Sequence, residues 1–400
     1  MRRIRKKKET TCMLTALLLS AAFANMAYAS NRGSIDYAPK QVSYERERTA
    51  EEWAKLRDQN ISWDELQDLV HEYNPTVSKA WLAYRDNENS DAFNLDYDHA
   101  MQSIEDAYDA ALAASNGDSV KEATAELNRA QSLTMSGIDS TLQNSDARVA
   151  EMNVQLSELA MTEKVREGIV SIYTGALQTE LSKLTAENKA AKLASAQRRE
   201  AAGTGTEIET MTAEKDAKDA EAAVQSTQAD EIKSRQTLLV NLGFNYNANP
   251  TICAVPEVSE QEILSIDPQK DQATGLGNSY AYKIACRKLE VTESESGKAA
   301  QELSVTTTRT KVQSDMTSAY NALLTAKNGY DQALLKSQNA KESLAATERS
   351  VAVGAASARD LEDARYNASA EEINVSLSKY AMQKAYFSYC AYRDGLAGQG

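Results

Sequence analysis

The chain has 400 residues, of which 44 are basic and 58 are acidic, and its formal net charge is −14. Phosphate backbones repel an acidic protein of this kind, which argues against nucleic acid as a partner. Only 5 prolines are present, and none of them lies in 76–249 or in 269–400. This distribution predicts long helices packed along narrow seams and argues against a compact mixed fold.

Residues 1–29 have the form of a cleaved secretion signal. A basic start and an apolar run precede Ala27-Tyr28-Ala29, which is the small-x-small pattern that signal peptidase accepts. The apolar run is shorter than the roughly 20 residues that a membrane-spanning helix requires, and no later segment reaches that length. We therefore expect an exported mature chain that begins near Ser30 and has no helical anchor.

A first helical repeat is predicted over 61–249, after an N-terminal arm over 30–60. The opening residues 62–65 (Ser-Trp-Asp-Glu) have the form of a capping box, in which a serine and a glutamate satisfy the first N–H groups of a helix. Compared with the second repeat, this one has extra residues at about 86–150. That segment is acidic and helical in pattern, with another capping box at 119–122, and it predicts an inserted helical hairpin.

Residues 250–268, which hold three of the prolines, are predicted to link the first repeat to a second one over 269–400. A membrane β-strand needs about nine to eleven alternating residues. In the second repeat only 303–312 has such character, and it alternates poorly. The predicted fold is therefore all-α and elongated. It consists of antiparallel helical hairpins that pack as coiled coils in two structural repeats, without a clear β-barrel.

Two glycines, Gly203 and Gly354, are predicted to end long helices at the tips of two helical hairpins. Each lies between runs of helix-forming residues, and glycine is the usual residue just beyond a helix C-terminus. The tips share one order of residue types, which indicates an internal duplication. The matching positions are Gly203, Thr206, Glu209 and Ala213 in the first tip and Gly354, Ser357, Asp360 and Ala364 in the second.

Asp360 and Asp363 follow the second tip and share one face of the predicted helix, because they are three residues apart. Around a threefold axis, six such carboxylates would form an acidic ring at a pore. Alternatively, they are two solvated acids in the first turn of a helix, where the helix dipole favours negative charge. The sequence is compatible with both interpretations.

Nothing in the sequence predicts catalysis. The histidines His71 and His99 are too far apart to indicate a metal site, and no catalytic triad or phosphate loop stands out. We therefore expect no enzyme activity, no cofactor and no metal. Cys253, Cys286 and Cys390 follow the signal, and the sequence leaves their state open between one disulfide and three small buried apolar side chains.

With these features, the chain resembles the TolC-type outer-membrane efflux proteins over most of 61–397. The matching features are the signal, the opening from Trp63 to Pro75, the duplicated hairpin with its glycine tips, and the Ala319-Tyr320 pair upstream of the second tip. The resemblance implies a homotrimer that encloses a long helical tunnel.

The resemblance also implies roles for particular residues. The tips at Gly203 and Gly354 would dock a membrane-fusion adaptor and an inner-membrane pump, and Asp360 and Asp363 would form acidic rings at the tunnel entrance.

Two classes of function follow from the sequence. The first is an exported efflux or secretion component that forms a trimeric helical conduit. The second is an exported coiled-coil structural or interaction protein that has lost channel function. Either protein belongs to the cell envelope, at the outer membrane or in the periplasm of a cell that has an outer membrane, and otherwise outside the cell or on its wall. The sequence leaves membrane association and the transported substrate open.

Overall fold

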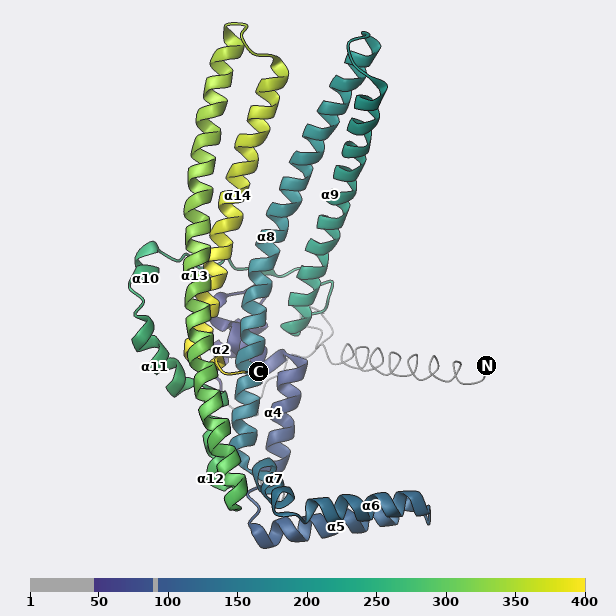
Figure 1. The fold of residues 1–400 in the computed structure, drawn as a ribbon, viewed down its shortest axis with the longest axis vertical. Helices are drawn as coiled ribbons and strands as arrows, with labels where there is room; N and C mark the ends of the chain where they lie inside the picture. Colours follow the sequence, from purple (N-terminus) through teal and green to yellow (C-terminus); the bar gives the residue numbers. More distant parts are fainter. Residues whose placement is uncertain (1–46, 89–92, 400) are drawn as a thin grey trace.

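The computed structural model describes residues 47–88 and 93–399. Two long helical hairpins lie side by side along the molecule, and both of their turns lie at the same end (Figure 1). The first hairpin is α8 (Ala147–Ala201) with α9 (Glu207–Asn241), and the second is α13 (Glu295–Ala352) with α14 (Ala358–Ala391). The predicted secretion signal, residues 1–29, lies outside the described residues.

These helices confirm the prediction of an all-α, elongated fold. The two spans without proline can hold uninterrupted hydrogen-bonded ladders, and α8 and α13 continue for 55 and 58 residues. In the described ranges the strands are β1 (Asn60–Ile61) and β2 (Thr251–Ile252), which pair in parallel. Residues 303–312, the run with some strand character, lie within α13.

The first repeat begins in the lower half of the molecule as drawn in Figure 1. Helix α2 (Ala50–Arg57) lies in the N-terminal arm, and the 3-10 turn η1 (Trp63–Glu65), α3 (Leu66–Tyr73) and α4 (Pro75–Glu88) follow it in the repeat. The capping box predicted at 62–65 is confirmed, because the Ser62 amide donates to Glu65 Oε1 over 2.7 Å. It starts η1, which passes directly into α3.

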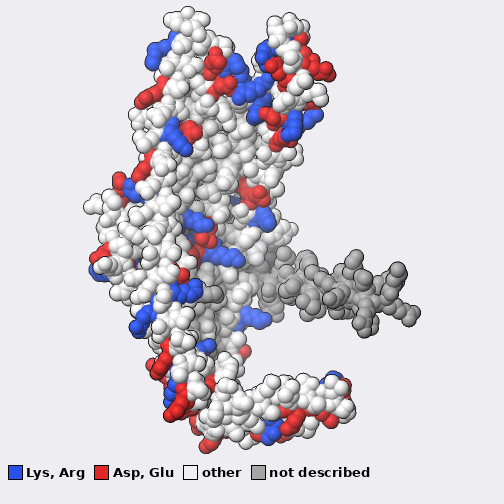
Figure 2. Space-filling view, viewed as in Figure 1, with Lys and Arg blue, Asp and Glu red and all other residues white. Residues whose placement is uncertain are grey.

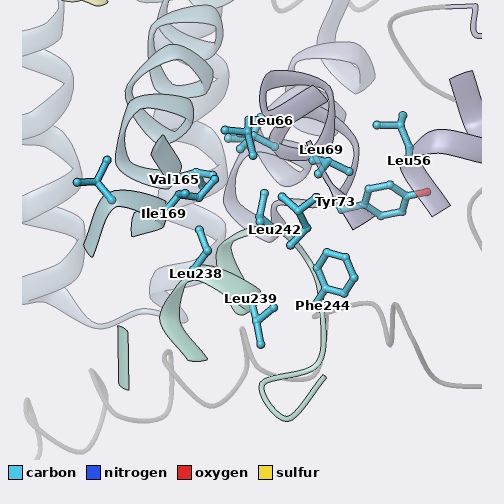
Figure 3. Packing of buried hydrophobic residues seen from close by; sticks show 14 of the residues in the cluster. Leu56, Leu66, Leu69, Tyr73, Val165, Ile169, Leu238, Leu239, Leu242 and Phe244 are labelled. Atoms are coloured by element: carbon cyan, nitrogen blue, oxygen red, sulfur yellow. The ribbon is translucent and has the colours of Figure 1, made fainter. Parts of the chain in front are cut away.

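The main apolar core joins α3 to the first hairpin (Figure 3). Leu66 and Leu69 of α3 pack with Val165 and Ile169 of α8, and all four are buried. The end of α9 and the turn after it close this core with Leu238, Leu239, Leu242 and Phe244. Burial of these side chains anchors the start of the chain to the hairpin helices.

Three helices occupy most of the segment at about 86–150: α5 (Tyr97–Ser115), α6 (Ser119–Ser132) and α7 (Met135–Ser145). Helices α5 and α6 extend sideways at the end of the molecule opposite the tips (Figure 1). The capping box predicted at 119–122 is wrong by one residue. Asp118 is the N-cap, and its carboxylate accepts the Val120 and Lys121 amides, because the N-terminus of a helix favours a negatively charged group.

The predicted linker holds α10 (Glu260–Leu264). The second repeat follows with α11 (Pro268–Asn278) and α12 (Tyr280–Val291), and it ends in the π-helical turn η2 (Tyr392–Leu396). A second apolar core joins these elements to α13 and α14, with Val312, Met316 and Tyr389 buried. Cys253, Cys286 and Cys390 are free thiols and partly buried. No helix within 47–88 or 93–399 combines the length and apolar character needed to cross a membrane.

Candidate functional site

The first hairpin tip is a helix end of defined geometry. Gly203 has a φ of +74°, a left-handed conformation that glycine adopts without a steric penalty. Its amide donates to the Glu200 carbonyl over 2.9 Å, and the Thr204 amide donates to the Arg199 carbonyl over 2.9 Å. These two bonds form the Schellman motif, which satisfies carbonyls at the C-terminus of α8.

The second tip repeats this geometry bond for bond. Gly354 has a φ of +73°. Its amide donates to the Val351 carbonyl over 2.9 Å, and the Ala355 amide donates to the Ser350 carbonyl over 2.8 Å. At both glycines an added Cβ would meet no atom within 4 Å, so the outer surface of each turn is open.

The return helices also start in the same way. Thr206 caps α9 and Ser357 caps α14, and each forms a capping box with the acid three residues later, Glu209 or Asp360. The correspondence of residues between the tips that the sequence predicts is therefore confirmed.

Asp360 lies at the surface, and its carboxylate is engaged by its own helix start. Its Oδ2 accepts the Ser357 amide and the Ser357 hydroxyl, each over 2.8 Å. The amide and hydroxyl of Ser357 hold the pKa of Asp360 below its usual value. Asp360 is thus ionised at neutral pH and faces solvent in the single chain.

Asp363 points instead toward α8. Its Oδ1 accepts from Asn188 Nδ2 over 2.9 Å and from Arg359 Nη2 over 2.6 Å, and Lys192 Nζ lies 3.4 Å away. Partial burial opposes ionisation of Asp363, but the two hydrogen bonds and the nearby cations outweigh it and lower its pKa. Asp363 therefore ties α14 of the second hairpin to α8 of the first.

Neither interpretation of the two aspartates included this tie. The partners Asn188 and Lys192 lie on α8, and Asn188 is buried. In the sequence, Asn188 lies 175 residues from Asp363 inside a run of ordinary helical residues, and no pattern distinguishes it. Asp360 has the local role that the helix-start interpretation assigns to it.

The surfaces around the two tips differ. Ile208 and Met211, near the start of α9, are 76% and 63% exposed. At the corresponding positions α14 carries Arg359 and Glu362, which form an ion pair with a distance of 3.0 Å. Figure 2 shows charged side chains of both signs on the upper parts of both hairpins, below the ends of the turns. The first tip thus exposes two large apolar side chains on its return helix, whereas at the second tip the exposed large apolar side chain is Val353, in the turn itself.

Farther from the tips, α8 and α14 stay in contact along a seam. Tyr173 of α8 stacks on Tyr380 of α14 with ring centroids 5.7 Å apart, and Lys384 Nζ of α14 lies 3.2 Å from Glu167 Oε1 of α8. Glu163, one turn before Glu167, is buried, and its Oε2 has no hydrogen-bond partner. Burial raises the pKa of Glu163 to about 7.

A second buried carboxylate on α8, Glu158, is fully engaged. Its Oε2 lies 2.7 Å from His71 Nδ1 and accepts from Trp81 Nε1 over 2.8 Å, and its Oε1 accepts from Gln67 Nε2 over 3.2 Å. Burial acts to raise the pKa of Glu158, but its interactions with His71, Trp81 and Gln67 together outweigh burial and lower the pKa. This network joins α3 and α4 to α8. In the described ranges no group of His, Cys, Asp and Glu is arranged to hold a metal ion.

Comparisons with known proteins find similarity in structure alone. No family model matches the chain. No curated protein matches it in sequence. The outer-membrane channel OprN is 12% identical, with a TM-score of 0.55 and coverage of 90% of this chain and 97% of that one. The CmeC outer membrane channel of Campylobacter jejuni is 12% identical, with a TM-score of 0.54 and coverage of 92% and 94%.

A membrane protein from Pseudomonas aeruginosa gives a similar result, with 12% identity, a TM-score of 0.52 and coverage of 90% of this chain and all of that one. These similarities cover at least 90% of this chain and at least 94% of each of the three matched chains. They confirm the predicted resemblance to TolC-type proteins at the level of the fold.

Proposed function

We propose that the chain is an exported component of an efflux or secretion system in the cell envelope, and that it acts in transport rather than catalysis. Three copies form a helical conduit, placed at the outer membrane or in the periplasm where the cell has an outer membrane. The observation that carries the proposal is the pair of equivalent tips at one end of a fold that matches outer-membrane channels over 90% of the chain.

The flanks of the single chain support an oligomer. Helices α9 and α13 lie on opposite flanks of the paired hairpins (Figure 1). Each carries large apolar side chains in water, Ile232 on α9 and Leu334 with Leu335 on α13. A contact between α9 of one copy and α13 of the next would cover both surfaces, and a head-to-tail contact of this kind closes into a ring.

The tips supply the docking surface for a membrane-fusion adaptor and an inner-membrane pump. Gly203 and Gly354 present turns whose outer surface is open, and Ile208, Met211 and Val353 expose apolar side chains next to them. An exposed apolar patch beside an open backbone turn is a typical protein interaction surface.

In such a trimer Asp360 and Asp363 form the acidic ring at the entrance. Asp360 contributes the exposed carboxylate, and Asp363 fixes the position of α14 through its bonds to Asn188 and Lys192. Rings of carboxylates attract cations and select for them at a pore.

Sedimentation equilibrium of the mature protein, with and without detergent, tests the oligomer, and we expect trimers. A protein that is monomeric at every accessible concentration would rule out the conduit. Docking is tested in cells that lack the chromosomal copy, by measuring ethidium accumulation after complementation. The wild-type chain and Gly354→Asn should both lower accumulation, because asparagine tolerates a left-handed backbone. Gly354→Trp should fail to lower it, because the indole blocks the turn.

Two other outcomes are informative. Equal transport by Gly354→Trp and Gly354→Asn would show that the second tip does not dock a partner. If ethidium accumulation is the same in cells with and without the trimer, the second class of function is favoured. The chain would then be an envelope protein with a structural or interaction role.

A further inference from the structure

Helices α5 and α6 form a hairpin that leaves the body of the molecule sideways, and we call residues 97–132 the side hairpin. We propose that the side hairpin binds a second copy of this chain, on the outer face of the first turns of α13. This inference rests on the oligomer proposed above. It adds a contact at the end of the molecule opposite the tips.

The side hairpin is a stiff unit attached at one end. At its root, Ala100 and Ile104 of α5 pack with Ile138 and Leu142 of α7. Beyond the root, Nε and Nη2 of Arg129 each donate to the Glu105 carboxylate over 2.6 Å. These two bonds link α6 to α5. A helix of 19 residues is about 28 Å long, so the hairpin extends well beyond the flank that carries α9 (Figure 1).

One face of α6 is apolar and has no partner within the described residues. Val120 and Leu127 are 74% and 57% exposed, and Ala123 and Ala130 are exposed beside them. Spacings of three and four residues place these four side chains in one stripe. The opposite face of α6, with Ala125 buried, packs on α5. The stripe has the spacing of a coiled-coil seam whose second helix is missing.

A matching stripe lies on the outer face of α13. Leu303 is 70% exposed, and Ala299, Thr306 and Thr310 are exposed four residues before it, three after it and seven after it. Val312, about half a turn away from Thr310, is buried in the molecule's own core. The small side chains around Leu303 leave room for Val120 and Leu127, and no charge interrupts either stripe.

Position and charge select this surface on a second copy. The side hairpin extends on the α9 side of the molecule, at the same end at which α13 begins on the other side (Figure 1). In a head-to-tail ring it therefore points at the α13 flank of the neighbour. The side hairpin has seven acidic and two basic residues, whereas 280–311, which holds α12 and the start of α13, has six basic and four acidic ones. Contact between two side hairpins, or with an anionic membrane, would be repulsive.

Thiol crosslinking tests the contact directly. In a mature chain with Cys253, Cys286 and Cys390 replaced by serine, Leu127→Cys and Leu303→Cys are introduced singly and together, and a bismaleimide is added. Both positions are exposed, so the fold should be kept. We expect linked dimers and trimers with the double variant only.

A change of charge tests the energetics. Leu127→Asp should weaken trimer association at least tenfold in sedimentation equilibrium, because it places a carboxylate in the apolar stripe. Asn128→Asp adds the same charge one residue later, beside the stripe, and should change association less than twofold.

The other outcomes each have a definite meaning. Linking by Leu127→Cys alone would show that side hairpins meet one another and would overturn the inference. Trimers that form but do not link, or that tolerate Leu127→Asp, would also overturn it and would leave the proposed conduit intact. If neither the chain with its native cysteines nor the chain with serine in their place forms trimers, both the proposed conduit and this inference are overturned.

Discussion

Helices α8 and α13 are counterparts in the two repeats, but the side chains that they bury differ in kind. They have 55 and 58 residues and lead into tips of the same geometry. Both helices bury apolar side chains, but α8 also buries Glu158 and Glu163, whereas no acid is among the buried residues of α13. The reason is the environment: α8 packs on α3, α4, α7, α9, α12, α14 and η2, whereas α13 packs on α11, α12, α14 and η2. A duplicated sequence pattern thus fixes the hairpin, and the neighbouring elements decide which side chains become buried.

The largest difference between the counterparts should appear when Glu158 is removed. Glu158→Ala leaves His71 and Trp81 buried without their acceptor, and we expect a loss of about 4 kcal/mol in the free energy of unfolding. Counted back equally from the tip glycines Gly203 and Gly354, the corresponding residue in α13 is Arg309, which is exposed and donates to the Tyr282 hydroxyl. Arg309→Ala should cost less than about 0.5 kcal/mol. Urea unfolding at one protein concentration measures both, and similar losses would contradict the comparison.

The next effect depends on pH. Because burial raises the pKa of Glu163 to about 7, the folded chain holds a proton there that the unfolded chain releases near pH 4.5. The contribution of this group is therefore fully present below about pH 4.5 and is lost as the pH rises to about 7. Glu163→Gln, which cannot ionise, should be more stable than the wild type by about 3 kcal/mol at pH 8 and equal to it at pH 4.

Thermal unfolding of both proteins across this pH range checks the prediction. The α13 counterpart of Glu163 is Ser314, which does not titrate, so Ser314→Ala serves as the control and should show the pH profile of the wild type. A Glu163→Gln variant whose profile parallels that of the wild type would show that the carboxyl group is ionised and solvated in the folded chain.

The smallest effect should be shared by the two repeats. Gly203→Ala and Gly354→Ala each force alanine into a left-handed conformation, at φ values of +74° and +73°, and each should cost about 1 kcal/mol. Gly329 lies inside α13 with open space around it, so Gly329→Ala should stabilise the helix by a similar amount. Denaturant unfolding measures all three variants. Unequal losses at the two tips would mean that one turn makes contacts that the other lacks.

The sequence by itself determined the features that depend on neighbouring residues. The absence of proline permits the long helices, Gly203 and Gly354 end them, and the serine, threonine and acid at fixed spacing start the return helices. Each of these interactions joins groups within about six positions of one another, so residue types and spacing are sufficient to predict it. Even the error at Ser119 is local, because the adjacent Asp118 provides the better cap.

The tertiary structure alone decided the features that join distant parts of the chain. Asp363 bonds to Asn188 across 175 positions, and Glu158 meets His71 across 87. The raised pKa of Glu163 and the unpartnered stripe of α6 also depend on which helices pack nearby. In an alanine-rich seam many registers are nearly equivalent, so the pattern of one helix does not specify which face of another it meets. Packing of the whole bundle selects that register and, with it, the polar contacts along α8.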